Sequence, residues 1–496
     1  MEDPSASAAL NWISGRSNWL IVFDNADGGY QVVEKFLPPG KSGSILITSR
    51  DKGLERVSLD ENSLEVQEMG EKEAVSLLLQ SAMIGSSTAK SVDLAQKLVK
   101  AVGYVPIAID QAGAFVHSCA CSLGDYLEML QQEYTQLMSI PEFKGASDYG
   151  YSTYGTWEIS MKEIERRATN NSGWQGMAAQ SALKLFKIFA FFHHQGIHED
   201  IFRNAAQNYW KRKDEQNDLP CSISVLDAEN LFLTAAGGWN MLQFQAGIQV
   251  LVSFSLVKSY NKQYSVHPLV HTWSRDRIPR PDMIRSCSYA RALLSCSIEA
   301  DYEVDNYGYC GLLVPHIKMN HKIAKKLKAD DVYYDDESTR FGFVFGRVGS
   351  WEEAEKQYMK STVRRRERLG GDHPSTFTSM ANLACTYSNQ GKWEDAEKLE
   401  LHVMGARKAK LGADHPDTLT SMANLACTYS NQGMWEDAEK LKLHVMEASK
   451  AKLGADHPST LTSMANLAST YRDQGRWEDA ETLALQMMEL KEGQKV

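Results

Sequence analysis

The last third of the chain repeats itself every 42 residues, and this repetition constrains the fold more than any other feature. The segment TSMANLACTYSNQGKWEDAEKL is followed by TSMANLACTYSNQGMWEDAEKL and by TSMANLASTYRDQGRWEDAETL. The tryptophans Trp393, Trp435 and Trp477 are 42 residues apart, and Trp351 marks a more divergent unit one step earlier. Because a unit this short has only its neighbours to pack against, the repeats predict a solenoid.

Each unit is expected to contain two helices. In the first, apolar residues recur three and four positions apart, as at Phe377, Met380 and Leu383. Gly391 ends this helix, and a second helix is expected from Trp393 up to a glycine and an Asp-His-Pro turn. With their LGxDHPxT and NLAxxYxxQG motifs, the units resemble the 42-residue tetratricopeptide repeats of kinesin light chains.

A polar stripe on the first helix is a candidate peptide-binding surface. Ser379, Asn382, Thr386 and Asn389 are spaced by three, four and three residues, which predicts that they share one face. Asparagine is a poor residue inside a helix, but its amide donates and accepts hydrogen bonds at once, which suits an extended peptide backbone. The resemblance implies this use on the concave face of the solenoid. The predicted peptide-binding residues are Asn382, Asn424, Asn466, Ser379, Ser421 and Ser463. A neutral residue copied by duplication remains the alternative.

Two short apolar segments near the N-terminus have the character of parallel strands. Residues 19–24 read WLIVFD and residues 44–50 read SILITSR, so each ends in polar or charged residues. They resemble the Walker B strand and the sensor-arginine strand of NB-ARC proteins, a class of nucleotide-dependent switches. Residues 64–69 are expected to form the next strand, before a helix over residues 71–82, and GYVPIA at 103–108 stands where that family has its GLPLA motif. The resemblance implies that Asp24 holds Mg²⁺, Arg50 is the sensor and Pro106 packs on adenine.

The segment that resembles a nucleotide-binding domain shows no phosphate-binding loop in its sequence. The one Gly-Lys-Ser, Gly40 to Ser42, precedes a strand instead of opening a helix after one, so a surface turn is predicted. In the resembling family the P-loop strand lies between the two strands named above, so both are expected to have lost a shared neighbour. We therefore expect a fragment that binds no cofactor, with ADP or ATP and Mg²⁺ bound only where a longer product supplies the loop.

The middle of the chain predicts helices followed by a hairpin. Residues 181–192, 198–210 and 239–253 have helical character, and alternating segments flank Asn261-Lys262. This order is typical of a winged helix, although the last helix carries no Lys or Arg and so does not suit DNA. VHPLV resembles a variant of the MHD motif seen in fungal NLR-like proteins, which implies that His267 reaches the β-phosphate. A capping histidine is the alternative interpretation.

Composition excludes several other functions. The 496 residues carry a net charge of −10, which disfavours nucleic-acid binding. No segment has the apolar length of a membrane span or the character of a secretory signal. Eight cysteines form no CxxC pair or zinc-ligand spacing, so buried reduced thiols in a cytoplasmic protein are expected, with no metal site. No catalytic constellation is recognisable, and we expect no enzyme unless a longer product supplies the P-loop.

The sequence therefore predicts a multidomain α/β plus α chain. Its expected parts are a partial NB-ARC domain with a P-loop NTPase-like parallel sheet and a helical subdomain over 1–140, a winged-helix-like domain over 150–280, and an α-solenoid of tetratricopeptide repeats over 285–496, clearest from 340. The expected function is that of an NLR-like (STAND) receptor fragment, which signals by binding a protein or peptide through its repeats beside a degenerate or truncated ADP/ATP switch. The alternative is an active ATP/ADP-dependent switch whose P-loop lies in a missing N-terminal part. Homo-oligomerisation remains open.

Overall fold

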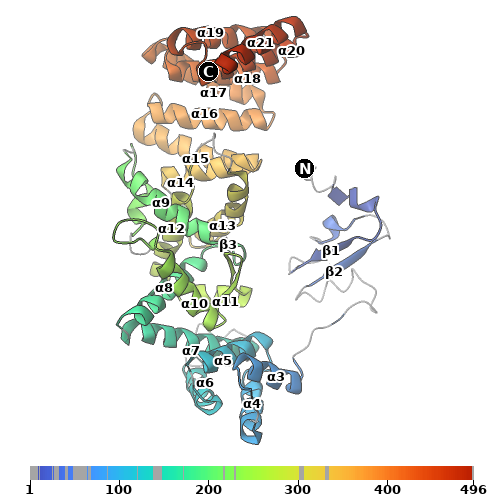
Figure 1. Ribbon diagram of the computed structural model, residues 1–496, viewed down its shortest axis with the longest axis vertical. Helices are drawn as coiled ribbons and strands as arrows, with labels where there is room; N and C mark the ends of the chain where they lie inside the picture. Colours follow the sequence, from blue (N-terminus) through green and yellow to red (C-terminus); the bar gives the residue numbers. More distant parts are fainter. Residues whose placement is uncertain are drawn as a thin grey trace. The chain divides into compact units, whose positions relative to one another are not determined.

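The computed structural model of the chain is mostly helical, with a small parallel sheet near the N-terminus (Figure 1). It divides into two compact units, Met1–Gly70 and Glu71–Val496. The structure describes residues 9–10, 12–24, 26, 33–38, 43–48, 64, 69–85, 88–119, 121–137, 148–170, 172–215, 218–227, 231–300, 306–329 and 334–493.

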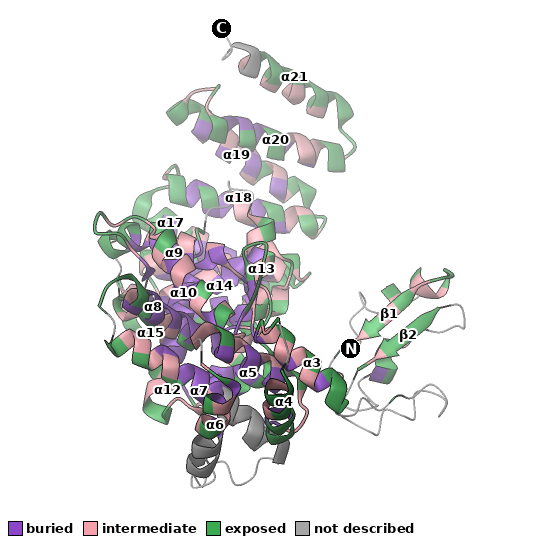
Figure 2. Cartoon of the chain, turned by 60° about the horizontal axis from the view of Figure 1, so that its bottom comes forward, coloured by how far each residue is buried: buried purple, intermediate pink, exposed green. Residues whose placement is uncertain are grey.

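The first unit contains two parallel strands that are hydrogen-bonded directly to each other. β1 (Leu20–Phe23) pairs with β2 (Ser44–Ile47) so that Leu20 lies opposite Ser44. The expected loss of a shared neighbour implies unpaired N–H and C=O groups along two inner edges, and the direct pairing shows that this consequence is wrong. Direct pairing satisfies the backbone N–H and C=O groups that an intervening strand would otherwise bond. The apolar side chains remain largely exposed (Figure 2). The strand expected over 64–69 and the Gly-Lys-Ser turn lie largely or wholly outside the described residues.

The second unit begins with helices that pack on one another. They are α3 (Glu71–Ser81), α4 (Ala89–Ala101), α5 (Pro106–Cys119), α6 (Leu123–Leu137) and α7 (Asp148–Asn170). Thr88 caps α4 by accepting a hydrogen bond from the Ser91 N–H. α3 contacts both α4 and α5, and α6 contacts α7. The helix expected over 71–82 is thus confirmed as α3.

A group of helices and a three-stranded antiparallel sheet form the middle of this unit. Its elements are α8 (Trp174–Phe189), β3 (Ile197–His198), α9 (Glu199–Asp214), η5 (Ser222–Val225), α10 (Met241–Ser253), β4 (Lys258–Tyr260), β5 (Gln263–Ser265) and α11 (Pro268–Asp276). The strand order is β3-β5-β4. The predicted hairpin is confirmed, and its turn residues Asn261 and Lys262 both have positive φ, which matches the twist of a two-residue hairpin loop. Aromatic side chains, among them Phe202 and Phe244 at 5.1 Å between ring centroids, fill the core beneath the sheet.

Antiparallel helix pairs form the remainder of the chain (Figure 1). Two helices, α12 (Arg280–Cys296) and α13 (Tyr307–Lys326), come first. The repeats follow as α14 (Asp335–Arg347), α15 (Trp351–Leu369), α16 (Pro374–Asn389), α17 (Trp393–Leu411), α18 (Pro416–Asn431), α19 (Trp435–Leu453), α20 (Pro458–Asp473) and α21 (Trp477–Gly493). Each helix from α14 onward contacts the next, so the predicted solenoid is confirmed. Small clusters such as Phe377, Met380 and Val403 form its core.

Candidate functional site

A histidine-proline pair starts the first helix of each near-identical repeat. The Nδ1 atoms of His373, His415 and His457 accept hydrogen bonds from the N–H group two residues further on, at 3.3, 3.2 and 3.1 Å. The following proline occupies the first helical position, where no N–H is needed. Because the caps are equivalent, α16, α18 and α20 begin at the same point of each repeat and present equivalent residues on equivalent faces.

The predicted serine positions do not lie on an accessible face. Ser379, Ser421 and Ser463 are all buried. Their hydroxyl groups donate to carbonyl oxygens one turn back in their own helices, at 2.8, 2.9 and 2.7 Å. A serine can be buried in this way because its own helix satisfies its hydroxyl group. The prediction that these serines contact a peptide is therefore corrected.

The accessible stripe of the first helix contains different residues around the same asparagine. In α16, Thr378 and Asn389 are exposed, and Asn382 and Cys385 are half-buried, whereas Thr386 is buried. The equivalent of Cys385 in the next repeat, Cys427, is an exposed free thiol. The expectation of buried thiols is wrong at that position.

The three predicted asparagines keep their amide groups available. Asn382 and Asn424 are half-buried and Asn466 is exposed. Within the described part of the chain, none of these three side chains makes a hydrogen bond. The other asparagines of the stripe differ, because the Asn389 amide donates to the Cys385 carbonyl at 2.8 Å and the Asn431 amide to the Ser388 hydroxyl at 3.2 Å. Each first helix therefore offers one amide with a donor and an acceptor for an external group.

A glutamine–glutamate contact joins each repeat to the next. The side-chain amides of Gln390, Gln432 and Gln474 donate to carboxylates of the preceding second helix at 2.8, 2.9 and 2.8 Å. The acceptors are Glu355, Glu397 and Glu439, each 35 residues earlier. Since the same contact recurs at every step, neighbouring repeats are held in the same relative position.

Two buried charges behind the stripe are absent from the sequence-based prediction. Glu400 on α17 and Lys442 on α19 occupy the same position of successive repeats, and both are buried. Burial raises the pKa of Glu400 to about 7, against the opposing effect of a hydrogen bond with Thr428. The Lys442 ammonium donates to Ser430 at 2.9 Å and to Thr470 at 2.7 Å. A comparison of the near-identical repeats would have found this position, because it is one of the few at which they differ.

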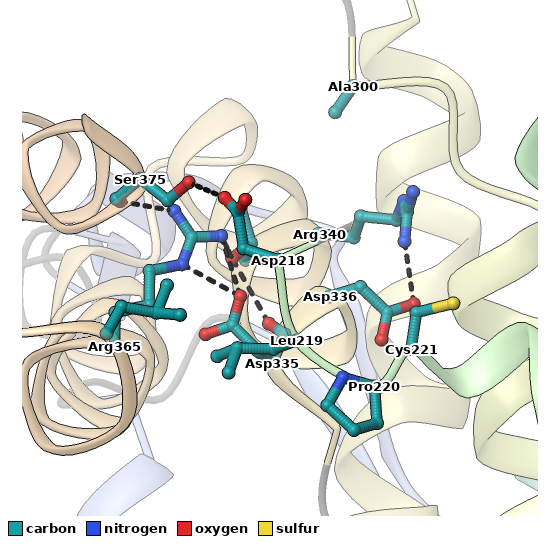
Figure 3. Close-up of a pocket in the computed structure, with 12 residues that line it drawn as sticks. Asp218, Leu219, Pro220, Cys221, Ala300, Asp335, Asp336, Arg340, Arg365 and Ser375 are labelled. Atoms are coloured by element: carbon teal, nitrogen blue, oxygen red, sulfur yellow. Dashed lines mark hydrogen bonds and ion pairs between the residues drawn. The ribbon is translucent and has the colours of Figure 1, made fainter. Parts of the chain in front are cut away.

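A cavity of about 290 Å³ lies where the middle of the chain meets the first repeats (Figure 3). Asp335 and Asp336, in the first turn of α14, face different arginines across it. Arg365 of α15 contacts Asp335 at 2.7 Å and also donates to the Ser375 carbonyl at 2.7 Å. Arg340 contacts Asp336 at 2.8 Å. Asp335, Asp336, Arg340 and Arg365 each therefore have a partner of opposite charge, and Asp218 adds a third carboxylate to the lining.

The same cavity joins a loop of the middle segment to the repeats. The hydroxyl of Ser375, at the start of α16, donates to Asp218, and Asp218 also lies 3.9 Å from His373. On the other side, the N–H and hydroxyl of Ser222 donate to Asp336 at 2.8 and 2.5 Å. Next to Asp336 in sequence, Glu337 forms a fully buried ion pair with Arg291 of α12 at 2.8 Å. The first turn of α14 thus holds three elements together.

The residues predicted to contact a nucleotide belong to different elements of the chain. Asp24 follows β1, is exposed and accepts a hydrogen bond from the Thr48 hydroxyl at 2.6 Å. Pro106 is exposed at the first position of α5, after Tyr104 with φ of 54°. Arg50 lies outside the described residues.

His267 is the N-cap of α11, as the alternative interpretation proposed. Its Nδ1 accepts from the Leu269 N–H at 3.3 Å, the contact that the histidines of the repeats also make. Partial desolvation and the nearby Lys258 ammonium lower the pKa of His267. Binding of a β-phosphate by His267 remains a prediction. Because Nδ1 is used in the cap, the phosphate contact would be made by Nε2.

No cluster of three or more histidine, cysteine, aspartate or glutamate side chains arranged to hold a metal ion occurs among the described residues. In that part of the chain, no helix combines the length and the apolar character that crossing a bilayer requires.

Comparison with known sequence families identifies the solenoid. Residues 376–417 and residues 429–493 each match a family model described as a tetratricopeptide repeat. These helix pairs are tetratricopeptide repeats. The tetratricopeptide units therefore include α16, which carries the first of the available asparagines.

The chain is also similar to a curated fungal protein. A nucleotide-binding leucine-rich repeat (NLR)-like protein of Hyaloscypha variabilis is 28% identical over 394 residues, which cover 73% of this chain and 34% of that protein. The resemblance to NLR-like proteins is thus confirmed. The chain spans about a third of the length of this relative.

Solved structures with related helices include two of note. A crystal structure of a putative kinesin light chain from Podospora anserina, with nearly identical tetratricopeptide-like repeats, is 21% identical with a TM-score of 0.33, and the match covers 38% of this chain and 95% of that one. A signal-transduction ATPase with numerous domains (STAND) and a tetratricopeptide repeat sensor, from Pyrococcus horikoshii, is 12% identical with a TM-score of 0.33, over 96% of this chain and 69% of that one.

Proposed function

We propose that this chain is an interaction protein of NLR-like signalling that binds an extended segment of a protein partner on the accessible stripe of its tetratricopeptide repeats. The observation that carries the proposal is the set of three equivalent amides, on Asn382, Asn424 and Asn466, that have no partner within the described residues. A polar group at such positions is of no use to the core, and it lowers helix propensity. An unbonded amide in a repeated array suits a ligand that presents backbone groups at regular intervals.

The strength of such binding can be bounded. One amide can make two hydrogen bonds with a peptide backbone, each contributing about 0.5–1.5 kcal/mol net. Three asparagines then supply roughly 3–9 kcal/mol, before the cost of ordering the peptide. We expect dissociation constants in the micromolar range, since about 1 µM corresponds to roughly −8 kcal/mol.

The decisive variant replaces all three asparagines by alanine. We expect it to lose capture of peptides selected from an array by the wild-type chain, and to keep its thermal midpoint because alanine is the better helix former. Asn389→Ala is the matched control, since that amide is already bonded within its own helix. Early unfolding of the triple variant would make the asparagines structural. Undiminished peptide capture by a folded triple variant would place binding elsewhere.

The nucleotide-binding role proposed for this chain is that of a degenerate or truncated ADP/ATP switch without enzymatic activity. Asp24, Arg50, Pro106 and His267 match the motifs of the resembling family, whereas the sequence offers no P-loop lysine after a strand. We expect weak or no binding of a fluorescent ADP analogue in an anisotropy titration. Sub-micromolar affinity that Pro106→Ala weakens would contradict this.

An active switch is the second candidate function. It is favoured by the similarity to a much longer NLR-like protein. In that case a P-loop supplied from outside this sequence would bind ADP or ATP with Mg²⁺. An in-frame GxxxxGK[ST] motif in genomic DNA upstream of the first codon would support this candidate, and its absence would oppose it.

The middle segment is proposed to be a winged helix that serves as a joint between domains. Support comes from the order of α8, α9 and α10 with the sheet β3-β5-β4. α10, the helix that would enter a major groove, contains no lysine or arginine, so a nucleic-acid partner is not proposed.

A further inference from the structure

The junction between successive repeats has a polar half that recurs three times. At each junction the first helix of one unit packs on the second helix of the unit before it, as α16 does on α15. The glutamine of the first helix then donates to the glutamate of the second. At two of the three junctions a basic residue two positions after the glutamine joins the same carboxylate. These ion pairs are Lys392 with Glu355 at 2.8 Å and Arg476 with Glu439 at 2.9 Å.

The junction also has an apolar half. Met404 of the second helix α17 packs against a core cluster that contains Leu419 and Met422 of the first helix α18. These two residues precede the glutamine of their own helix, Gln432, by thirteen and ten positions. A second helix therefore presents a glutamate and a methionine, and the first helix that covers it brings apolar side chains, an amide and, at two junctions, a cation.

α21 presents the same half of the junction with nothing on it. It is the second helix of its repeat, and no helix follows it within the described residues (Figure 2). Glu481 and Met488 occupy the positions of Glu439 and Met446. Met488 is 61% exposed, whereas Met446 and Met404 are half-buried. Glu481 is exposed and makes no hydrogen bond or ion pair with any described residue. The open side of α21 thus has both the apolar and the polar contact group of a junction.

We infer that the open side of α21 binds the first helix of a tetratricopeptide unit carried by a partner protein. Continuity with the three existing junctions defines that helix. It has apolar side chains thirteen and ten positions before a glutamine, and a basic residue two positions after it. A second copy of this chain offers no free helix of this kind among its described repeats, because Gln390, Gln432 and Gln474 are already bonded within their own array. The surface is separate from the asparagine stripe, so the inference goes beyond the proposed function and does not depend on it.

The test measures binding of a labelled peptide to the full chain by fluorescence anisotropy. The peptide has the sequence of residues 454–476, which contains α20 with its glutamine and the following arginine, and it stands in for the partner's helix. We expect saturable binding to the wild type, and at least tenfold weaker binding to Glu481→Lys and to Met488→Glu. Glu478→Lys is the matched control and should bind as the wild type does. Glu478 is exposed on the same helix, and its equivalents Glu394 and Glu436 are exposed even though their helices are covered.

A charge reversal distinguishes a direct contact from damage to α21. The peptide with Arg476→Glu should bind the wild type at least tenfold more weakly than the unchanged peptide does, and should recover most of that loss on the E481K chain, since the ion pair is then reversed. Unfolding of the E481K chain would not produce such a recovery. Absence of binding to the wild type, or equal binding to the wild type and E481K, would overturn the inference and leave the proposed function standing. A wild-type dimer that E481K and M488E dissociate in sedimentation would also overturn it, because a second copy would then cover α21.

Discussion

Substitution of Glu400 by glutamine should stabilise the repeats in a pH-dependent manner. Glu400 is buried between neighbouring repeats, and its pKa rises from an ordinary 4.5 to about 7 in the folded chain. A carboxyl whose folded pKa is raised binds its proton more tightly in the folded state. At low pH Glu400 is protonated in both states and does not destabilise the folded chain. Its ionisation increasingly lowers the free energy of unfolding as the pH rises from 4.5 towards 7.

The size of the effect follows from the pKa. Since one pKa unit corresponds to about 1.4 kcal/mol, ionisation of Glu400 reduces the local free energy of unfolding by about 2–3 kcal/mol above pH 7. Glutamine keeps the shape and the hydrogen bond to Thr428 but carries no charge. We expect E400Q to gain most of this free energy at pH 8 and less than about 1 kcal/mol at pH 5.

Hydrogen exchange followed by mass spectrometry can measure this locally in the full chain. Peptides covering α17 and α18 should exchange ten- to hundredfold more slowly in E400Q than in the wild type at pH 8, and at nearly the same rate at pH 5. Glu394→Gln, an exposed change on the same helix, should alter neither. An equal effect of E400Q at both pH values, or faster exchange at pH 8, would refute the assignment of a buried, titrating carboxyl.

Three further perturbations test the contacts around the first repeats. Arg291→Met leaves Glu337 buried without its partner and should lower the free energy of unfolding in urea by roughly 3–5 kcal/mol. Adding Glu337→Leu should largely reverse this loss. No recovery in the double variant would contradict the ion-pair explanation. His415→Ala removes the cap of α18 and should cost about 1 kcal/mol in exchange of its first turn, whereas His415→Asn should restore it. Asp218→Ala should speed exchange at the start of α16, around Ser375, and leave α20 unchanged, and an effect confined to α20 would contradict this contact.

The helices of the repeats could be predicted almost completely from the sequence. Trp393 and Gly412 bracket a predicted helix that the structure places at Trp393–Leu411, and Gly412 has the positive φ that favours glycine after a helix. The near-identity of the copies strengthens the prediction, because the same helix-start and helix-end residues occur in each copy. Local patterns suffice here since the contacts of a solenoid are local in sequence.

The site was predicted only in part, for physical reasons that differ between residues. The stripe pattern located Asn382, but it could not show that Ser379 is buried, because a serine hydroxyl satisfied by its own helix looks the same in sequence as an exposed one. Glu400 was missed since charged residues are expected in solvent. The direct pairing of β1 with β2 joins segments 24 residues apart. It was not predicted because a strand pattern in the sequence does not show with which other strand it pairs.

The recurring contact between Gln390 and Glu355 has a consequence for how such a chain can change over generations. Each of the three near-identical repeats carries both halves of this link, a glutamine towards the unit before it and a glutamate at the position that faces the unit after it, whereas the divergent first unit supplies only Glu355. A 42-residue duplication or deletion by unequal recombination therefore creates no mismatched junction, since the new neighbours bring the same two groups together. The array can therefore grow or shrink by whole units while every junction keeps this link, and the number of repeated asparagines changes with it.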